Sequence, residues 1–260
     1  MRSTAIALPP LLREGDRLGS DDFLRRWEAM PDLKHAELID GVVFIMSSPV
    51  GYSHAAICLE MSGWLHAYKE ATPGCEAGLN ATCVMSAADV PQPDVFLRIA
   101  PEYGGQSGET HGYGSGAPEL IVEVSGSTLS RDLGAKLELY RRTGVREYLS
   151  VLLNPRQIVW RELARGRYRE IKRDADGLLR SRVFPGLWLD PEAVWSSKKP
   201  IGAAVRKGTA SQDHAAFVRR LKVAQKRRHL HVSVLRRASP VAHPAEEARA
   251  RGARRPAVTA

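Results

Sequence analysis

The feature that most constrains the fold is a short apolar run with a charged residue at its centre. In the stretch "PELIVEV", residues 118–124, Glu123 is flanked by Leu120, Ile121, Val122 and Val124. A run of β-branched and apolar residues of this length is typical of a strand that is buried on both faces of a sheet. An unpaired carboxylate in such a strand costs on the order of several kcal/mol, so we expect a cation or a hydrogen-bond donor beside Glu123.

The elements around this strand predict a single α/β (α+β) domain with a mixed sheet. Helical spacing of apolar residues predicts helices over about 20–30, 53–68 and 131–143. Asp40–Gly41 lies between two apolar runs and predicts a hairpin with a two-residue turn. Further strands are expected in "NATCVM", "PDVFLRI", "REYLSVLL", "QIVWREL" and "RYREIK". The Gly-rich stretch "PEYGGQSGETHGYGSGAP" lacks the G-K-[ST] ending of a phosphate-binding loop and is interpreted as a flexible surface loop.

The helix expected after Glu123 carries a second charge in an unusual place. At roughly 100° per residue, Lys136 falls within the apolar side of this helix, which is formed by Leu133, Leu137, Leu139 and Tyr140. One interpretation is that the lysine stem lies along the apolar surface while its ammonium pairs with Asp132 or reaches solvent. The other interpretation is that Lys136 belongs to a buried site.

A third charged residue begins another predicted strand. Asp94 opens "PDVFLRI", one loop before the Glu123 strand, and two neighbouring strands would bring the two acids together. Carboxylates that close repel each other, whereas a Mg²⁺ ion held by one or two carboxylates and by substrate phosphate turns them into a ligand set. With a lysine nearby to orient water and stabilise phosphate charge, Asp94, Glu123 and Lys136 are the equipment for metal-assisted phosphodiester hydrolysis.

Several stretches, in this order along the chain, resemble a known family. The stretches "AELIDGVVFIMSSP", "PDV", "PELIVEVSGST" and "RDLGAKLELYRRTGVREYLSVLLNP" are similar to the Uma-two family of restriction-endonuclease-like proteins, over roughly residues 20–195. The resemblance implies a PD-(D/E)XK nuclease fold, in which helices flank a mixed sheet. It also implies Mg²⁺-dependent cleavage of DNA.

The resemblance further implies a role for each charged residue. Asp94 and Glu123 would be the metal ligands, for Mg²⁺ or for Mn²⁺. The nuclease pattern expects a lysine two residues after the second acid, where this chain has Ser125. Lys136, on the following helix, would be its replacement.

The same resemblance gives Glu37 as an additional catalytic residue and His54 as a weaker candidate. Glu37, in "AELIDG", would be an additional acid at the edge of the site, although a solvent-facing strand residue is an equal alternative. Many relatives have Ser-Pro-Ser where this chain has Ser125–Gly126–Ser127. The glycine gives the backbone there more conformational freedom.

The charge distribution predicts three segments. Residues 197–260 hold 16 Lys and Arg against 3 Asp and Glu, whereas the first 196 residues hold 22 and 26. We therefore expect an N-terminal extension over 1–19, a restriction-endonuclease-like domain over 20–196 and a basic tail over 197–260. One helix is predicted at about 211–228, and the remainder of the tail, rich in Ala, Arg and Pro, is expected to be disordered. The tail would either contact DNA phosphates or act only as a solubilising extension, and a chain ending at Ser196 is expected to fold.

Other features of the sequence indicate a reduced and soluble protein. Cys58, Cys75 and Cys83 have neither an even count nor C-x-x-C spacing, so they are interpreted as reduced, structural residues. Pro9–Pro10 interrupts the short N-terminal apolar run, and no stretch approaches the length of a membrane span. A cytoplasmic location with no membrane partner is expected.

Two functions of different class are consistent with these observations. The first is a Mg²⁺-dependent endonuclease acting on duplex DNA, for which a homodimer would supply one site for each strand. The second is a catalytically silent nuclease-fold protein that binds nucleic acid or acts as an accessory factor, as the displaced lysine and the basic tail suggest. A third interpretation, an unrelated α/β structural domain, would leave Asp94, Glu123 and Lys136 apart from one another.

Overall fold

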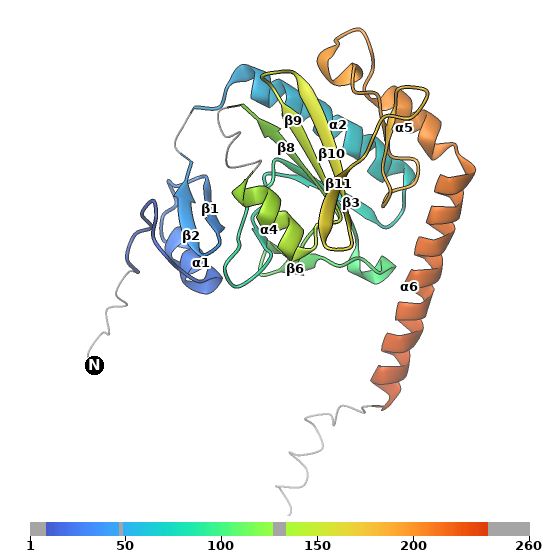
Figure 1. Ribbon diagram of the computed structural model, residues 1–260. Coiled ribbons are helices and arrows are strands. Elements are labelled where there is room, and N and C mark those ends of the chain that lie inside the picture. The colour runs from blue at the N-terminus through green and yellow to red at the C-terminus, as the bar shows by residue number, and fades with distance from the viewer. Residues whose placement is uncertain (1–8, 47–48, 127–133, 239–260) are drawn as a thin grey trace, which may run out of the picture.

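The computed structural model describes residues 9–46, 49–126 and 134–238, with side chains described as far as Leu230. A six-stranded sheet forms the centre of the molecule, and helices lie against both of its faces (Figure 1). The predicted mixed α+β fold is therefore confirmed. The helices are α1 (Ser20–Glu28), α2 (Tyr52–Ala71), α4 (Ala135–Thr143), α5 (Gly202–Thr209) and α6 (Gln212–Ala238), and the short 3₁₀ turns are η1 (Pro101–Tyr103) and η2 (Ala193–Trp195).

The central sheet has the strand order β11-β10-β9-β8-β5-β3. Its strands are β3 (Cys75–Leu79), β5 (Val95–Ile99), β8 (Leu120–Ser125), β9 (Glu147–Leu152), β10 (Gln157–Ala164) and β11 (Arg167–Glu170). Among these described strands only the β8–β9 pair is parallel, because α4 crosses over between the two. The strand that contains Glu123 is central, as the apolar run predicted, and all six of its residues are buried.

Side chains of β8 alternate between two apolar layers. Val122 packs in the main core with Trp64 and Leu65 of α2, whereas Ile121 packs with Leu139 and Tyr140 of α4. Helix α2 therefore covers one face of the sheet and α4 covers the other (Figure 1). Glu123 comes two residues after Ile121, and successive residues of a strand alternate between its faces, so its side chain is directed toward α4.

The predicted hairpin is confirmed and forms a small separate sheet. Strands β1 (Ala36–Ile39) and β2 (Val42–Ile45) are antiparallel, and the turn residues Asp40 and Gly41 both have positive φ, at 53° and 72°. Such a turn matches the twist of two-residue hairpins and favours glycine at its second position. Two further small sheets are formed by β4 (Cys83–Val84), β6 (Gly108–Thr110) and β7 (Tyr113–Ser115), and by β12 (Leu179–Arg180) and β13 (Trp188–Leu189).

The Gly-rich stretch is more ordered than the predicted surface loop. It contains η1 and the β6–β7 hairpin, whose turn is formed by His111 and Gly112 with positive φ. The buried carboxylate of Glu119 accepts the backbone N–H groups of Ile99 (2.9 Å) and Gln106 (3.1 Å), which fixes both ends of the segment. Gly105 lies so close to the carbonyl of Ile99 that a Cβ atom would clash. The glycines therefore allow close backbone contacts and turns, and they do not make this segment disordered.

The segment after Ser196 contributes to the core, which the predicted boundary did not anticipate. Ile201 and Val205 at α5, and Phe217 and Leu221 of α6, are buried in the main apolar cluster. His214 is also buried, with Nε2 at 2.9 Å from the hydroxyl of Thr72 at the end of α2, a contact that fastens the start of α6. Helix α6 is longer than the predicted 211–228 and runs along the edge of the body (Figure 1), where Arg228 donates a hydrogen bond to the carbonyl of Pro101. Residues 239–260, which were expected to be disordered, lie outside the described residues.

A chain ending at Ser196 is now expected to be strongly destabilised. It would lack the buried side chains of Ile201, Val205, Phe217 and Leu221, and burial of each such side chain stabilises a fold by about 1.5–3 kcal/mol. Their sum is comparable with the whole free energy of unfolding of a typical domain. Thermal unfolding of chains ending at residues 196 and 238 tests this expectation. Equal melting temperatures would show that α5 and α6 are dispensable.

Glu147 is a second fully buried carboxylate, at the start of β9. Its Oε1 accepts the backbone N–H groups of Arg182 (2.6 Å) and Val183 (3.1 Å), and its Oε2 accepts the hydroxyl of Ser181 (2.8 Å). Burial raises the pKa of Glu147 to about 7, although these hydrogen bonds act in the opposite direction. The carboxylate therefore joins β9 to the β12–β13 turn.

The stability of the chain is expected to fall as the pH rises from about 4.5 to 7. In this window the folded chain keeps a proton on Glu147 that the unfolded chain has released, so the free energy of unfolding decreases with pH and levels off above 7. A shift of this size corresponds to on the order of 3 kcal/mol. Urea unfolding at pH 5 and pH 8 should show this fall, and Glu147→Gln should lack it. Parallel pH profiles for the two proteins would contradict the assignment.

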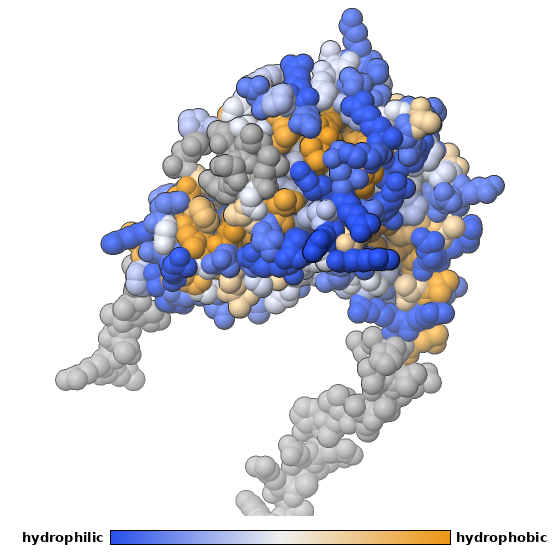
Figure 2. Space-filling model, in the orientation of Figure 1, coloured by the Kyte–Doolittle hydropathy of each residue, from blue (hydrophilic) through white to orange (hydrophobic). Residues whose placement is uncertain are grey.

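Hydrophilic side chains cover most of the visible surface, and apolar patches occur along α6 (Figure 2). The exposed apolar residues include Val223 and Leu230 of that helix. Within the described part of the chain, none of the helices combines the length and apolar character needed to cross a bilayer.

Candidate active site

The carboxylate of Glu123 lies at the centre of a buried polar cluster between β8 and α4. Its Oε1 is 3.0 Å from Nζ of Lys136 and accepts the hydroxyl of Tyr140 at 2.6 Å. Glu123 and Lys136 are only 3% and 2% exposed, so solvent screens their attraction little. The cation expected beside Glu123 is therefore Lys136, and the ammonium group is buried rather than directed to solvent.

Tyr140 lies one helical turn after Lys136 and contacts the same carboxylate oxygen. The sequence interpretation placed this side chain only in the apolar core, and it is indeed buried there. Burial, followed by the charges of Glu123 and Glu37, raises the pKa of Tyr140 well above its ordinary value. The phenol therefore remains a hydrogen-bond donor to Glu123. The i, i+4 spacing of the two polar groups on α4 was the available signal for this arrangement.

Glu37 of β1 is the second carboxylate that contacts Lys136. Its Oε1 is 2.9 Å from Nζ of Lys136 and accepts the backbone N–H of Gln92 at 2.8 Å. The side chain is buried, so the alternative of a solvent-facing strand residue is wrong. Its Oε2 is also buried and has no hydrogen-bond partner among the residues that the structure describes. A buried carboxylate oxygen in this state is a ready ligand for a cation.

The hairpin that carries Glu37 is fixed to α4 by a second ion pair. Asp89 is buried, and its carboxylate contacts Arg142 near the end of α4 and the backbone N–H of Asp40 in the hairpin turn. Leu38 and Val90 form an antiparallel bridge beside it. These contacts hold β1 against α4, so that Glu37 faces Lys136.

Asp94 lies at the start of β5, beside β8. The β5–β8 ladder pairs Val95 with Val122, and its next position along both strands would pair Asp94 with Glu123. Oδ2 of Asp94 accepts the backbone N–H of Val124 at 2.8 Å. The carboxylate therefore makes the hydrogen bond that a backbone carbonyl of a neighbouring strand would otherwise make. The predicted strand neighbourhood of the two acids is thus confirmed, although the structure gives no role to either.

Asp94 also contacts α2, through His54. Nε2 of His54 is 3.5 Å from Oδ2 of Asp94. Burial alone would raise the pKa of Asp94, but the hydrogen bonds from His54 and Val124, together with the charge of Lys136, hold it below its ordinary value. The contact with Asp94 raises the pKa of His54 to about 10.

Cys58 completes this part of the site, one helical turn after His54. Its Sγ is 3.5 Å from Nδ1 and 3.9 Å from Nε2 of the imidazole, and the side chain is half-buried. Burial raises the pKa of its thiol. The sequence interpretation of Cys58 as a structural cysteine did not consider this contact, although His54 and Cys58 have the i, i+4 spacing of one helix face.

The site holds more carboxylates than cationic groups. Lys136 contacts the carboxylates of Glu123 and Glu37, and His54 contacts the carboxylate of Asp94. Hard divalent cations are bound by carboxylate oxygens, of which Oε2 of Glu37 lacks a partner among the described residues. The alternative pairing of Lys136 with Asp132 cannot be compared, because Asp132 lies outside the described residues.

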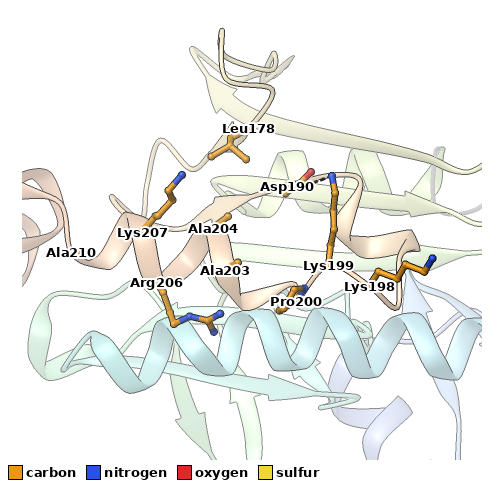
Figure 3. A pocket seen from close by; sticks show the side chains of 10 residues that line it. All are labelled: Leu178, Asp190, Lys198, Lys199, Pro200, Ala203, Ala204, Arg206, Lys207 and Ala210. Atoms are coloured by element: carbon orange, nitrogen blue, oxygen red, sulfur yellow. Dashed lines mark hydrogen bonds and ion pairs between the residues drawn. The ribbon is translucent and has the colours of Figure 1, made fainter.

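A basic pocket lies apart from the acidic cluster, beside α5. It has a volume of about 720 Å³ and shares no residue with that cluster. Figure 3 shows the side chains of Lys199 and Lys207 on two sides of the hollow. Nζ of Lys199 lies 3.4 Å from Oδ2 of Asp190. The cationic residues of the lining are Lys198, Lys199, Arg206 and Lys207. Such a concentration of cations suits an anion such as a nucleic-acid phosphate.

Comparisons with known proteins identify the family of the chain. The family model described as "Putative restriction endonuclease", named Uma2, matches residues 20–192, which include Glu37, Asp94, Glu123 and Lys136. No curated protein matches the chain. One similar solved structure is described as a putative nuclease belonging to DUF820 from Anabaena variabilis, with 17% sequence identity and a TM-score of 0.48, covering 63% of this chain and 88% of that chain. Because the family model spans more than half of its length, the chain belongs to the Uma2 family of restriction-endonuclease-like proteins.

Proposed function

We propose that the chain is an endonuclease that hydrolyses phosphodiester bonds in duplex DNA with a bound Mg²⁺ or Mn²⁺ ion. The observation that carries the proposal is the buried cluster in which Lys136 contacts both Glu123 and Glu37. The fold does not need two buried acids and a buried lysine for its stability, because apolar residues of similar volume would serve as well or better. Membership of the Uma2 family supports the nuclease class.

Each charged residue would have a separate role in this proposal. Asp94 and Glu123 would hold the ion, together with the backbone carbonyl of Val124, and Glu37 would stand at the edge of the site. The bound ion would supply Lewis acidity toward the scissile phosphate and lower the pKa of water. The N–H of Val124 positions the Asp94 carboxylate, and Tyr140 positions Glu123. Lys136 would orient the attacking water and oppose the growing negative charge.

Nicking of supercoiled plasmid DNA tests the proposal. The purified full chain is incubated with Mg²⁺, with Mn²⁺ and with a chelator, and Asp94→Asn is treated in parallel. We expect metal-dependent nicking by the wild type and none by the variant. Isothermal titration should show a Mg²⁺ or Mn²⁺ site that Asp94→Asn removes. If neither ion binds at Asp94, the metal-nuclease proposal is wrong.

The form of the cleaved plasmid addresses the oligomeric state. Cleavage of both strands in one binding event requires two sites, which a homodimer would supply. Linear product at early times would support a homodimer, whereas nicked circles alone would indicate that single sites act independently.

A second candidate is a nuclease-fold protein that binds nucleic acid without cleaving it. Two observations favour it: Lys136 is 2% exposed and enclosed by two carboxylates, and the basic pocket beside α5 lies outside the acidic cluster. This candidate predicts that the chain binds DNA in the absence of a divalent metal ion. It also predicts that no cleavage product forms when the ion is present.

The basic pocket is expected to contribute a salt-dependent part of DNA affinity. Changing Lys198, Lys199 and Lys207 together to Gln should weaken binding and reduce the log–log salt slope by up to about 0.9 for each phosphate that is no longer neutralised. Fluorescence anisotropy at several salt concentrations measures both quantities. Lys172→Gln, an exposed lysine that pairs with Glu170, is the matched control. Identical slopes for the triple variant and the wild type would show that the pocket does not contact DNA.

A further inference from the structure

His54, Cys58 and Asp94 form a cluster of three different metal-ligand types beside the acidic site. One ligand atom from each residue lies within 4.8 Å of the other two. Nε2 of His54 is 3.5 Å from Oδ2 of Asp94 and 3.9 Å from Sγ of Cys58. Each of the three side chains is only partly buried, so an ion has access to them. Neither the family description nor the proposed function uses Cys58.

The separations match the ligand shell of a small transition-metal ion. Ligand atoms at about 2.0–2.3 Å from a tetrahedral centre lie roughly 3.3–3.7 Å from one another. The His54 to Asp94 distance falls within this range, and the Sγ to Nε2 distance exceeds it by a few tenths of an ångström. All three ligand atoms lie within 4.8 Å of one another, so closing the ligand shell requires movement of these side chains.

The local structure holds two of the ligands in place. His54 and Cys58 are four residues apart within α2 (Tyr52–Ala71) and share one face of the helix. Asp94 accepts the backbone N–H of Val124, an outer contact that orients the carboxylate. Three protein ligands leave a fourth position open, which is the arrangement of exchangeable rather than closed structural sites.

We propose that His54, Cys58 and Asp94 bind a soft divalent cation such as Zn²⁺ or Co²⁺, at a site distinct in ligand chemistry from the proposed carboxylate site of Asp94 and Glu123. A thiolate and an imidazole favour Zn²⁺ and related ions, whereas Mg²⁺ requires oxygen ligands. Binding requires the thiolate of Cys58 and the neutral imidazole of His54, so both side chains release a proton to solvent. Asp94 is common to both sites, so a soft cation held here competes with Mg²⁺ for that carboxylate.

The simplest alternative is an ordinary network without a metal. In that case the imidazole of His54 only pairs with Asp94, and the Cys58 thiol packs against the ring. This alternative accounts for each contact separately but predicts no affinity for Zn²⁺ beyond that of an isolated histidine. The two descriptions therefore differ in a measurable property that involves no nucleic acid, and the inference extends beyond nuclease activity.

Cobalt absorption spectroscopy on the full chain tests the proposal. Chelator-treated, reduced protein is titrated with Co²⁺, and the near-ultraviolet thiolate-to-cobalt band is recorded before and after addition of Zn²⁺. We expect one equivalent of Co²⁺ to produce the band and Zn²⁺ to abolish it. Cys58→Ala should lack the band and bind Zn²⁺ at least about 100-fold more weakly. Cys83→Ala, a buried cysteine outside the cluster, is the matched control and should keep it.

The remaining outcomes either support or overturn the proposal. If Cys58→Ala does not fold by circular dichroism, Cys58→Ser replaces sulfur by oxygen at nearly constant volume and should lose the band while remaining folded. Absence of the band in the wild type, or its persistence without the Cys58 sulfur, would overturn the proposal. Because the readout contains no DNA, a wild type without nuclease activity but with the band would overturn only the proposed function.

Discussion

Glu123→Gln is expected to abolish metal-dependent cleavage while the chain remains folded. The amide keeps the volume of the side chain and an oxygen that can accept the Tyr140 hydroxyl, but it removes the negative charge that would bind the ion. A Lewis-acid metal contributes several kcal/mol to transition-state stabilisation, and about 1.4 kcal/mol corresponds to a tenfold change in rate. We therefore expect the nicking rate to fall by on the order of 10³-fold or more.

The matched control for this experiment is Glu138→Gln on the exposed side of α4. Glu138 pairs with Arg141 at the surface and does not contact Glu123 or Lys136, so its replacement should leave cleavage unchanged. Thermal unfolding of both variants checks that they are folded. Full activity of Glu123→Gln would remove Glu123 from the metal site and leave it a structural partner of Lys136.

Lys136→Met is expected to affect both stability and cleavage. The methionine preserves an unbranched side chain of similar length, but the buried carboxylates of Glu37 and Glu123 lose the cation that they share. Breaking a buried ion pair by removal of one partner destabilises proteins by about 3–5 kcal/mol. Loss of a preorganised electrostatic group costs roughly 10²–10³-fold in rate. Urea unfolding and plasmid nicking measure the two effects separately.

A second substitution separates the two roles of Lys136. In the double variant Glu37→Gln with Lys136→Met, one of the two buried negative charges is also removed, so part of the missing stability should return. Cleavage should not return, because no cation then faces the attacking water. Arg141→Met, which removes a surface cation from the same helix, is the control for the loss of charge. Wild-type cleavage by the Lys136→Met variant would reduce Lys136 to a purely structural ion-pair partner.

The local pattern of the sequence was sufficient for the central part of the fold. The apolar run around Glu123 predicted a fully buried strand, and β8 (Leu120–Ser125) is buried along its whole length. Asp40–Gly41 predicted the hairpin, because a two-residue turn with positive φ angles matches the twist of the strands on either side of it. The place of Lys136 in the apolar arc of its helix left two interpretations open, and the buried ammonium group is the one that the structure shows. In each case the pattern lies in a few residues that are close together in the sequence.

Secondary-structure elements with a weak local sequence pattern were not predicted. Strand β3 (Cys75–Leu79) has the sequence "CEAGL", without a β-branched residue, and is a strand because β5 supplies its hydrogen bonds. The Gly-rich segment was interpreted as flexible, yet the buried carboxylate of Glu119 orders it by accepting two backbone N–H groups. Contacts with residues elsewhere in the fold determine the conformation of both segments, because intrinsic strand preference is small compared with the free energy of strand pairing and burial.

The sequence by itself determined the strand of Glu123 and the helix of Lys136, because alternation and helical spacing are short-range properties of the chain. Only the tertiary structure decided which groups surround them. Glu37 reaches Lys136 through the packing of a hairpin against α4, nearly one hundred residues away along the chain. His54 and Cys58, near the start of α2, lie beside Asp94 although about 40 residues of chain separate them. Contacts between segments far apart in the sequence depend on packing that no local pattern encodes, since the whole core must form before those side chains meet.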